Sequence, residues 1–314
     1  MRRVSVDEYL GFVEENDSVK VGGEVIRLEP IRVKRLVPSE DELTDTTTTV
    51  WSFPKRGSWG THRGDYRGNW PPQMARAVIL MLTRPGDTVI DPMAGSGTTC
   101  IEAKLLGRNC LAVDIDYGAV MLTHHRLYWL EKAIEELGPP HPPDASPSDV
   151  LRARVEVYHG DARSLDLVSD SSIDLVATHP PYFNIIKYGS RLDRANLARA
   201  RKLSEYLGML RDVVREAFRV LKPGAHLAIL VGDTRRRRHY VPITHHALRL
   251  MLEEGFILRE EVIKIQHKMK TTREVWRRAR RDFLLIYHEK LFILRKPVDE
   301  DDKKRHRLST SEYP

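Results

Sequence analysis

"VIDPMAGSGTT", residues 89–99, reads as a buried strand that ends in an acidic residue, followed by a proline and a glycine turn that opens a helix. Glycines are required there because the backbone must turn sharply and let a ligand approach without a Cβ atom in the way. The stretch lacks the third glycine of a dinucleotide motif and the lysine of a phosphate-binding loop. The acid beside the turn therefore favours a cationic or amine-bearing ligand over a pyrophosphate.

The segments around this turn alternate between strand and helix patterns. A helix is predicted over 70–87, and the turn is followed by a helix over 98–107 and a strand over 110–116. The later predicted strands are 155–161, 172–179, 226–233, 256–266 and 282–296, and the later predicted helices are 117–137, 204–224 and 242–255. This order is typical of a parallel sheet covered by helices.

Length and composition predict one substantial core. The chain has 314 residues, of which 41% are hydrophobic and 30% charged. We predict an N-terminal extension or flap at 1–50, a main domain at 51–297 and a polar C-terminal tail at 298–314. No stretch approaches the ~20 apolar residues of a membrane span, and the first residues lack the apolar core of a signal peptide. We therefore expect a cytoplasmic protein that contacts no membrane; the sequence leaves its oligomeric state open.

The cysteine and glutamine content carries two weaker expectations. Cys100 and Cys110 are the only cysteines, and they fall in a predicted helix and a predicted strand without metal-ligand spacing. Buried thiols are the favoured interpretation, and no metal site is expected. Glutamine is scarce, with Gln73 and Gln266 alone, whereas arginine and glutamate are abundant. This composition is typical of a thermophilic source.

Positive charge is concentrated in two segments, GDTRRRRHY (232–240) and KIQHKMKTTREVWRRARR (264–281), in a chain of formal charge +7. Lysines and arginines displace counterions from phosphates whatever the base sequence, so a nucleic acid is the favoured partner. The alternative is a solvated basic surface. The nucleic-acid-binding residues that we predict are Arg235, Arg236, Arg237, Arg238, Lys268, Lys270, Arg277 and Arg278.

Acidic residues stand at or just after the ends of three predicted strands. Asp91 precedes the glycine turn, and Asp114 lies about twenty residues further on, where a carboxylate accepts hydrogen bonds from ribose hydroxyls. Asp161 ends the third strand, where it is placed to meet an adenine amino group. Each acid taken alone is equally compatible with a helix cap or a surface position. Three of them at successive strand ends favour a nucleoside-containing ligand.

Four motifs in a fixed order resemble a known enzyme family. DPMAGSGTT, AVDID, HGDA and THPPYFN are similar to motifs of S-adenosylmethionine-dependent DNA amino-methyltransferases, which modify N4 of cytosine or N6 of adenine. The order is that of the unpermuted members, and the resemblance, which extends to archaeal and bacterial N4/N6 DNA methylases, runs from about residue 51 to 297. It implies a Rossmann-like class I methyltransferase with a mostly parallel seven-stranded sheet, helices on both faces and an antiparallel edge hairpin.

The resemblance also assigns cofactor-binding residues. The segment GTHRGDYRGNWPPQ (60–73) resembles the element that packs against the methionine end of S-adenosylmethionine. By the same resemblance Asp91, Gly95 and Gly97 surround the methionine part, Asp114 binds the ribose and Asp161 the adenine. The full set of predicted cofactor-binding residues is Asn69, Asp91, Pro92, Gly95, Gly97, Thr98, Asp114 and Asp161.

The loop DLVATHPPYFN (174–184) supplies the implied catalytic residues. A base amine is a poor nucleophile because its lone pair is delocalised into the ring. In the family, the first side chain of the loop and the next carbonyl accept hydrogen bonds from the amine, while the aromatic residue stacks on a flipped base. Carried over, His179 and the Pro180 carbonyl are the acceptors, Pro181 stiffens the loop and Tyr182 stacks.

His179 departs from the family pattern, which has Ser in N4-cytosine enzymes and Asp or Asn in N6-adenine enzymes. A neutral imidazole still has one acceptor nitrogen, whereas an imidazolium has none. The simpler interpretation is that His179 only hydrogen-bonds neighbouring backbone. Because Thr178 matches the Thr-Ser-Pro-Pro-Tyr form of the cytosine enzymes, we expect a DNA cytosine-N4 methyltransferase. The alternatives are an RNA cytidine-N4 methyltransferase, a DNA adenine-N6 methyltransferase, and a non-catalytic nucleic-acid-binding protein with a decayed site.

Overall fold

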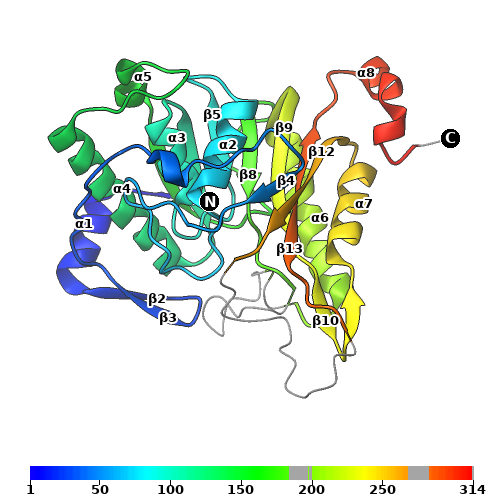
Figure 1. Cartoon of the computed structure of the whole chain (residues 1–314), viewed down its shortest axis with the longest axis horizontal. Helices are drawn as coiled ribbons and strands as arrows, with labels where there is room; N and C mark the ends of the chain where they lie inside the picture. The colour runs from blue at the N-terminus through cyan, green and yellow to red at the C-terminus, as the bar shows by residue number, and fades with distance from the viewer. Residues whose placement is uncertain (184–196, 198–199, 268–282, 313–314) are drawn as a thin grey trace.

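A computed structural model describes residues 1–183, 197, 200–267 and 283–312 (Figure 1). Its centre is a nine-stranded sheet in the order β1-β7-β6-β5-β8-β9-β13-β12-β4. The strands are β1 (Arg2–Val4), β4 (Val50–Ser52), β5 (Thr88–Asp91), β6 (Asn109–Asp114), β7 (Val155–His159), β8 (Ile173–Thr178), β9 (Leu221–Val231), β12 (Ile257–Ile265) and β13 (His288–Arg295). Two hairpins lie outside it, β2 (Ser18–Val21) with β3 (Glu24–Arg27) and β10 (Thr234–Arg236) with β11 (His239–Val241).

The predicted seven-stranded sheet is confirmed as the run from β7 to β12. Strands β7, β6, β5, β8 and β9 are mutually parallel, and β13 runs antiparallel to both β9 and β12. The β12–β13 pair is the predicted antiparallel hairpin. Residues 1–52 add one strand at each edge, because β1 pairs with β7 and β4 pairs with β12. The result is a Rossmann-like α/β fold.

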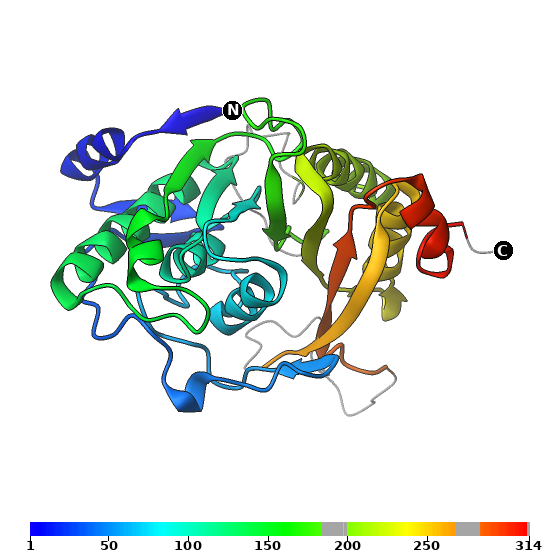
Figure 2. The same ribbon diagram turned by 90° about the horizontal axis from the view of Figure 1, so that it is seen from above.

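Helices cover both faces of the sheet. They are α1 (Val6–Glu15), α2 (Pro72–Leu82), α3 (Thr98–Leu105), α4 (Tyr117–Leu137), α5 (Pro147–Arg152), α6 (Leu203–Val220), α7 (Ile243–Glu253) and α8 (Glu300–Arg305). Figure 2 shows α2 and the α6–α7 pair on opposite sides of the strands. Successive strand residues alternate between the two cores: Val89 packs in the cluster with α2 and α3, and Ile90 in the cluster with α6 and α7. This is the period of two that a sheet buried on both faces requires.

The helix predicted over 204–224 ends earlier than expected. Val220 is the last residue of α6, and Leu221 already begins β9. The physical reason is Pro223: a proline disfavours helical backbone in the residue before it, so the chain leaves the helix ahead of it. Leu221 is buried and pairs with Ile173 of β8, so the chain continues directly as a strand of the sheet.

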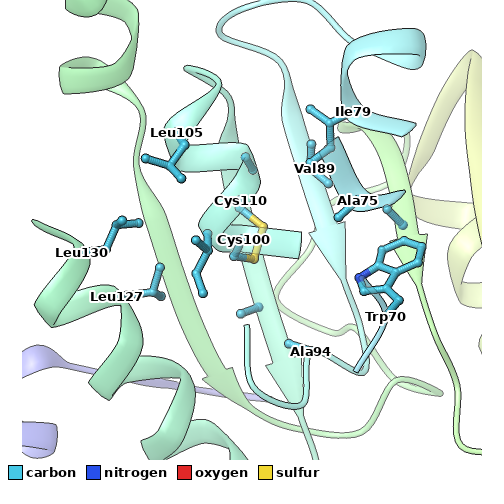
Figure 3. Close-up of a cluster of buried hydrophobic side chains, with 14 of the residues drawn as sticks. Trp70, Ala75, Ile79, Val89, Ala94, Cys100, Leu105, Cys110, Leu127 and Leu130 are labelled. Carbon is cyan, nitrogen blue, oxygen red and sulfur yellow. A yellow bond between two sulfur atoms is a disulfide. The ribbon is translucent and has the colours of Figure 1, made fainter. Parts of the chain in front are cut away.

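The two cysteines correct one expectation. Both are fully buried, as predicted, but they are joined in a disulfide between α3 and β6 rather than being free thiols (Figure 3). Helix α3 packs directly on β6, which brings the two Cα atoms within 5.4 Å, inside the range that a disulfide spans. Sequence spacing alone does not reveal this distance, since it arises from the way the helix folds back on the strand.

The ends of the chain pack on the sheet. Tyr9 of α1 is buried, and its hydroxyl lies 2.8 Å from Nδ1 of His125 in α4. At the other end Arg295 of β13 donates to Asp302 of α8 at 2.7 and 3.0 Å. The predicted division of the chain after residues 50 and 297 stays a prediction.

Candidate cofactor and base-binding site

The glycine turn between β5 and α3 has no space for side chains. Gly95 and Gly97 have φ values of +57° and +80°, which L-residues with a Cβ rarely adopt. A Cβ on Gly95 would lie 2.9 Å from the Tyr66 ring, and one on Gly97 would lie 2.9 Å from the Thr123 methyl group. Both glycines are therefore required by backbone conformation and by close packing.

Asp114, the last residue of β6, is tied to this turn. Its Oδ2 accepts a hydrogen bond from the Gly95 amide at 2.8 Å, and its Oδ1 accepts one from the Asp116 amide at 2.9 Å. Burial raises the pKa of Asp114 to about 7, although the two backbone hydrogen bonds oppose that rise. The residue as a whole is partly buried, and its carboxyl group lies at the edge of the glycine turn.

Asp91 is hydrogen-bonded to residues on both sides of the same turn. Its carboxylate is buried and accepts hydrogen bonds from the Thr99 hydroxyl at 2.5 Å and from the Met93 amide at 3.1 Å. Burial raises the pKa of Asp91 to about 6 against these hydrogen bonds. The following residue, Pro92, is also buried. Asp91 thus fixes the strand-to-helix turn, and its predicted contact with the methionine part stays a prediction.

The segment 60–73 lies against the turn, as its predicted role requires. Asn69 Nδ2 lies 3.3 Å from the hydroxyl of Ser96 in the turn and 3.1 Å from the Arg63 carbonyl. Thr98, in the first turn of α3, has a buried hydroxyl for which the described residues provide no hydrogen-bond partner. This hydroxyl is buried beside the glycine turn, so its predicted contact with the cofactor stays a prediction.

Asp161 follows β7 and already has a cationic neighbour. Arg163 reaches its carboxylate with Nη2 at 2.6 Å and Nε at 3.1 Å. The pairing of β6 with β7 sets Asp114 opposite His159, two residues before Asp161. The structure therefore brings Asp91, Asp114 and Asp161 to the same edge of three adjacent strands, and the adenine contact of Asp161 stays a prediction.

His179 comes directly after β8. Strand β8 pairs with β5, the strand that leads into the glycine turn. The Nε2 atom of His179 lies 2.6 Å from the Tyr182 hydroxyl, which in turn donates to Glu289 Oε1 at 2.6 Å. Lys264 donates to the other oxygen of Glu289 at 2.9 Å. These hydrogen bonds connect the loop after β8 to β13 and β12. His179, Tyr182, Glu289 and Lys264 therefore form one hydrogen-bonded group.

Glu289 and Lys264 were not predicted from the sequence. They lie opposite each other on β13 and β12. Burial acts to raise the pKa of Glu289, but the positive charge of Lys264, the neighbouring His179 and the hydrogen bonds from Tyr182 and Lys264 outweigh it and lower the pKa to about 2. The only signal in the sequence is a glutamate just before the apolar run LFIL, and in the structure this residue is 5% exposed.

The rest of the loop is packed tightly. Pro180 is buried, Pro181 is half-buried, and Tyr182 is buried with 7% exposure. The Trp70 ring, from the segment before α2, lies 6.5 Å from the His179 ring at an interplanar angle of 31°. His179 Nδ1 has no solvent-exposed surface, so a base reaches it only when neighbouring groups move aside. The stacking role of Tyr182 stays a prediction.

The first basic segment forms the β10–β11 hairpin. Arg236, Arg237 and Arg238 are exposed, and the last two occupy the turn with φ values of +49° and +71°. The Arg236 guanidinium lies 5.8 Å from the ring centroid of Phe183, next to the catalytic loop. Arg235 is half-buried and lies over Tyr240 at 5.4 Å. The hairpin therefore presents positive charge beside the His179 loop.

The second basic cluster cannot be placed. Lys268, Lys270, Arg277 and Arg278 lie outside the described residues. Within the described ranges, no group of three His, Cys, Asp or Glu side chains is placed to hold a metal ion. No helix of the described part is long and apolar enough to cross a membrane.

The sheet order defines a Rossmann-like α/β fold, and sequence comparison gives the family. The family model for N6/N4 DNA methylases, described as DNA methylase, matches residues 4–124 and 173–313. The match covers most of the chain, including the glycine turn, Asp114 and the His179 loop, but not Asp161. This chain therefore belongs to the N6/N4 DNA methylase family, whose cofactor is S-adenosylmethionine.

The relatives match over shorter stretches. The type II methyltransferase M2.MboI of Moraxella bovis is 32% identical over 79 residues, which is 25% of this chain and 29% of that protein. The tRNA (guanine(10)-N2)-dimethyltransferase of Methanothermobacter thermautotrophicus is 31% identical over 118 residues, 37% of this chain and 29% of that protein. The chain thus spans less than a third of these relatives' length. A SAM-dependent methyltransferase structure from Methanosarcina mazei aligns with a TM-score of 0.44 at 18% identity, covering 71% and 98% of the two chains.

The residues present fit this cofactor. The glycine turn takes a backbone conformation that residues with a Cβ rarely adopt, and the Asp114 carboxyl group at its edge would accept hydrogen bonds from the sugar hydroxyls. The Thr98 hydroxyl lacks a partner among the described residues. Asn69 and Thr98 are therefore the polar groups available to the methionine part, and Asp114 is the one available to the ribose.

Proposed function

We propose that the protein transfers a methyl group from S-adenosylmethionine to the exocyclic amine of a nucleic-acid base, most favourably N4 of cytosine in DNA. The observation that carries this proposal is the position of His179. It follows β8, whose pairing with β5 sets the Pro-Pro-Tyr loop beside the glycine turn. A base amine held by His179 is therefore near the place where the cofactor binds.

The chain's own residues make the amine reactive. The bound cofactor supplies an electrophilic methyl group on a positively charged sulfur. The His179 ring and the Pro180 carbonyl accept the two amine hydrogens, which favours a tetrahedral nitrogen with its lone pair directed at the methyl carbon. As the N–C bond forms and the C–S bond breaks, the nitrogen becomes positive and releases one proton along its hydrogen bond to His179. Proline holds the second acceptor because its φ is fixed.

Nucleic acid is supported by the surface around the loop. Arg236, Arg237 and Arg238 are exposed on a hairpin that contacts the catalytic loop through Arg236 and Phe183. Phosphates bound there would guide a strand toward His179. A target amine in a duplex reaches the loop only if its base is flipped from the helix.

Cytosine is favoured because Thr178 precedes the loop, as in the Thr-Ser-Pro-Pro-Tyr form. RNA is the second candidate substrate, because the relatives of this chain differ in substrate class. One is named as a tRNA (guanine(10)-N2)-dimethyltransferase, and another is named as a type II methyltransferase. The same loop chemistry serves a base amine in either nucleic acid. Substrate choice then depends on residues outside the acceptor group.

Nucleoside mass spectrometry tests the proposal. The purified protein is incubated with isotopically labelled S-adenosylmethionine and with duplex DNA, single-stranded DNA or RNA in parallel, and the products are digested to nucleosides. Labelled N4-methylcytosine in DNA is the expected product. Label in N6-methyladenine, or only in RNA, would mean that the substrate is adenine or RNA rather than cytosine in DNA. Unlabelled nucleic acid from a protein that still binds the cofactor would support a decayed site.

A further inference from the structure

The hydroxyl of Tyr182 contacts two partners that differ in what they accept. It lies 2.6 Å from Glu289 Oε1 and 2.6 Å from His179 Nε2. A tyrosine hydroxyl has one hydrogen to donate, and its oxygen can accept another hydrogen. Only one of the two neighbours therefore receives the tyrosine hydrogen, and the other must donate to the oxygen.

Glu289 decides between the two arrangements. The carboxylate is buried at the base of the loop and paired with Lys264 at 2.9 Å, which keeps it ionised. An ionised carboxylate has no hydrogen and can only accept, so Tyr182 donates to Glu289. The Tyr182 oxygen is then left to accept from His179, and the imidazole hydrogen must be on Nε2.

We propose that Glu289, acting through Tyr182, holds the ring hydrogen of neutral His179 on Nε2 and thereby makes Nδ1 the acceptor for the target amine. This inference rests on the proposed function, since it concerns the residue that receives the amine hydrogen. Tyr182 and Glu289 are positioning residues in this scheme. Lys264 keeps the carboxylate charged, so the effect passes from β12 through β13 to the loop after β8.

The Tyr182–Glu289 pair is needed because a histidine acceptor, unlike a Ser, Asp or Asn side chain, has two neutral tautomers. The oxygen acceptors of Ser, Asp or Asn side chains need no tautomer to be chosen. A neutral imidazole has two tautomers, and the one with hydrogen on Nδ1 would direct a donor at a donor amine. A histidine at this position therefore needs a partner that fixes its hydrogen, and the Tyr182–Glu289 pair provides one.

Nitrogen NMR reads the tautomer directly. Protein labelled with 15N in its histidine rings is studied by long-range 1H–15N correlation, at a pH where His179 is neutral. These spectra distinguish a ring nitrogen that bears hydrogen from one that bears a lone pair. The His179 signals among the 13 histidines are assigned by their absence in His179→Asn. The expected result is hydrogen on Nε2 and a lone pair on Nδ1.

Two variants remove the proposed control. Tyr182→Phe deletes the acceptor of the Nε2 hydrogen, and Glu289→Gln replaces the obligatory acceptor by an amide that also donates. We expect each to mix the two tautomers of His179 and to lower the single-turnover rate roughly 3- to 10-fold, the effect of one neutral hydrogen bond. Tyr158→Phe is the matched control, because the Tyr158 hydroxyl also donates to a carboxylate, that of Glu156 at 2.6 Å, but on β7.

Either of two results overturns the proposal. One is hydrogen on Nδ1 of His179 in the wild-type protein, and the other is an unchanged tautomer in both folded variants. The proposed function fails separately, through a wild-type protein that transfers no label from S-adenosylmethionine to DNA or RNA, whereas the tautomer of His179 is read without any methylation. A Tyr158→Phe protein whose His179 signals change as much as those of Tyr182→Phe also counts against the proposal.

Discussion

At Asp114, burial opposes the ribose-binding role that we propose for this residue. A carboxylate that accepts hydrogen bonds from ribose must be charged, whereas burial raises the pKa of Asp114 to about 7. Because the pKa is raised above the ordinary value of 3.8, the ligand-free fold is stabilised by this group at low pH. That stabilisation is lost as the pH rises through about 7. Cofactor binding has the opposite dependence, since it needs the form that predominates above the pKa.

We therefore predict that affinity for S-adenosylmethionine weakens as the pH falls below about 7. Asp114→Asn should weaken binding roughly 10- to 100-fold, since it loses charge-assisted hydrogen bonds, and should abolish this pH dependence. Isothermal titration calorimetry over about two pH units on either side of neutrality measures both effects. Equal affinity of the wild type and a folded Asp114→Asn protein would remove Asp114 from the ribose site.

His179 carries a second pH dependence of the same direction. Its acceptor role requires a neutral ring, so the single-turnover rate should fall as the pH drops and the ring becomes protonated. Tyr182 is hydrogen-bonded to the ring, and Glu289 and Lys264 are the charged groups joined to it through Tyr182. His179→Asn should keep measurable activity without the acidic decline, and His179→Ala should be severely impaired while retaining cofactor binding. A wild-type rate and pH profile for His179→Ala would make the histidine a bystander.

Whether a site residue could be predicted from the sequence depends on whether the residues that it contacts lie close to it in the chain. The glycine turn, Asp114 and the His179 loop were predictable, because each is a local pattern at a strand end. Glu289 was not, because it meets Tyr182 across 107 positions of sequence through a strand whose place beside β9 no local pattern gives. The Cys100–Cys110 bond was missed for the same physical reason, since it depends on helix packing.

At the scale of elements, short apolar runs predicted the buried strands, and apolar residues at helical spacing predicted the long helices. The three-residue strands β1 and β4 were missed, because so short a segment has no periodicity and is a strand only through its partner. The β10–β11 hairpin was predicted only as a basic segment. Its turn is formed by Arg237 and Arg238 with positive φ, which is unusual for residues other than glycine.

The hairpin gives a prediction about salt. Replacing Arg236, Arg237 and Arg238 by Ser should weaken nucleic-acid binding and flatten the slope of log affinity against log salt, because fewer counterions are released. Lys304, Arg305 and Arg307 are the matched control, since they are exposed in and after α8. Fluorescence anisotropy with labelled DNA over a salt series measures the slopes. Identical slopes for the two triple variants would mean that the hairpin is a solvated surface.

The α3–β6 disulfide gives a prediction about stability. Cross-links of this loop length stabilise a fold by about 3 kcal/mol in the chain-entropy model. Reduction should therefore lower the unfolding midpoint by roughly 4 °C for a chain of this size. Differential scanning calorimetry with and without dithiothreitol measures this shift, and Cys100→Ala/Cys110→Ala should show none. An equal response of both proteins to the reductant would mean that the cysteines are thiols in solution.

At the scale of the whole molecule, the N-terminal segment braces the cofactor half of the sheet. Glu8 of α1 accepts a hydrogen bond from the Tyr117 hydroxyl at 2.7 Å, and Tyr117 is the first residue of α4, three positions after Asp114. The His124 ring lies 3.1 Å from the Val4 carbonyl. Residues near the start of the chain thus fix α4, the helix that follows β6 and Asp114.

These contacts predict the result of removing residues 1–16, which contain β1 and α1. We expect a lower unfolding midpoint and weaker binding of S-adenosylmethionine, because α4 loses the partners of Tyr117, His124 and His125. The single variant Tyr9→Phe, which loses only the buried hydrogen bond to His125, should cost about 1 kcal/mol and serves as a milder test. Calorimetric unfolding and titration of both proteins measure these effects. A truncated protein that binds the cofactor with wild-type affinity would instead make residues 1–16 part of an independent flap, as the predicted boundary at residue 50 implies.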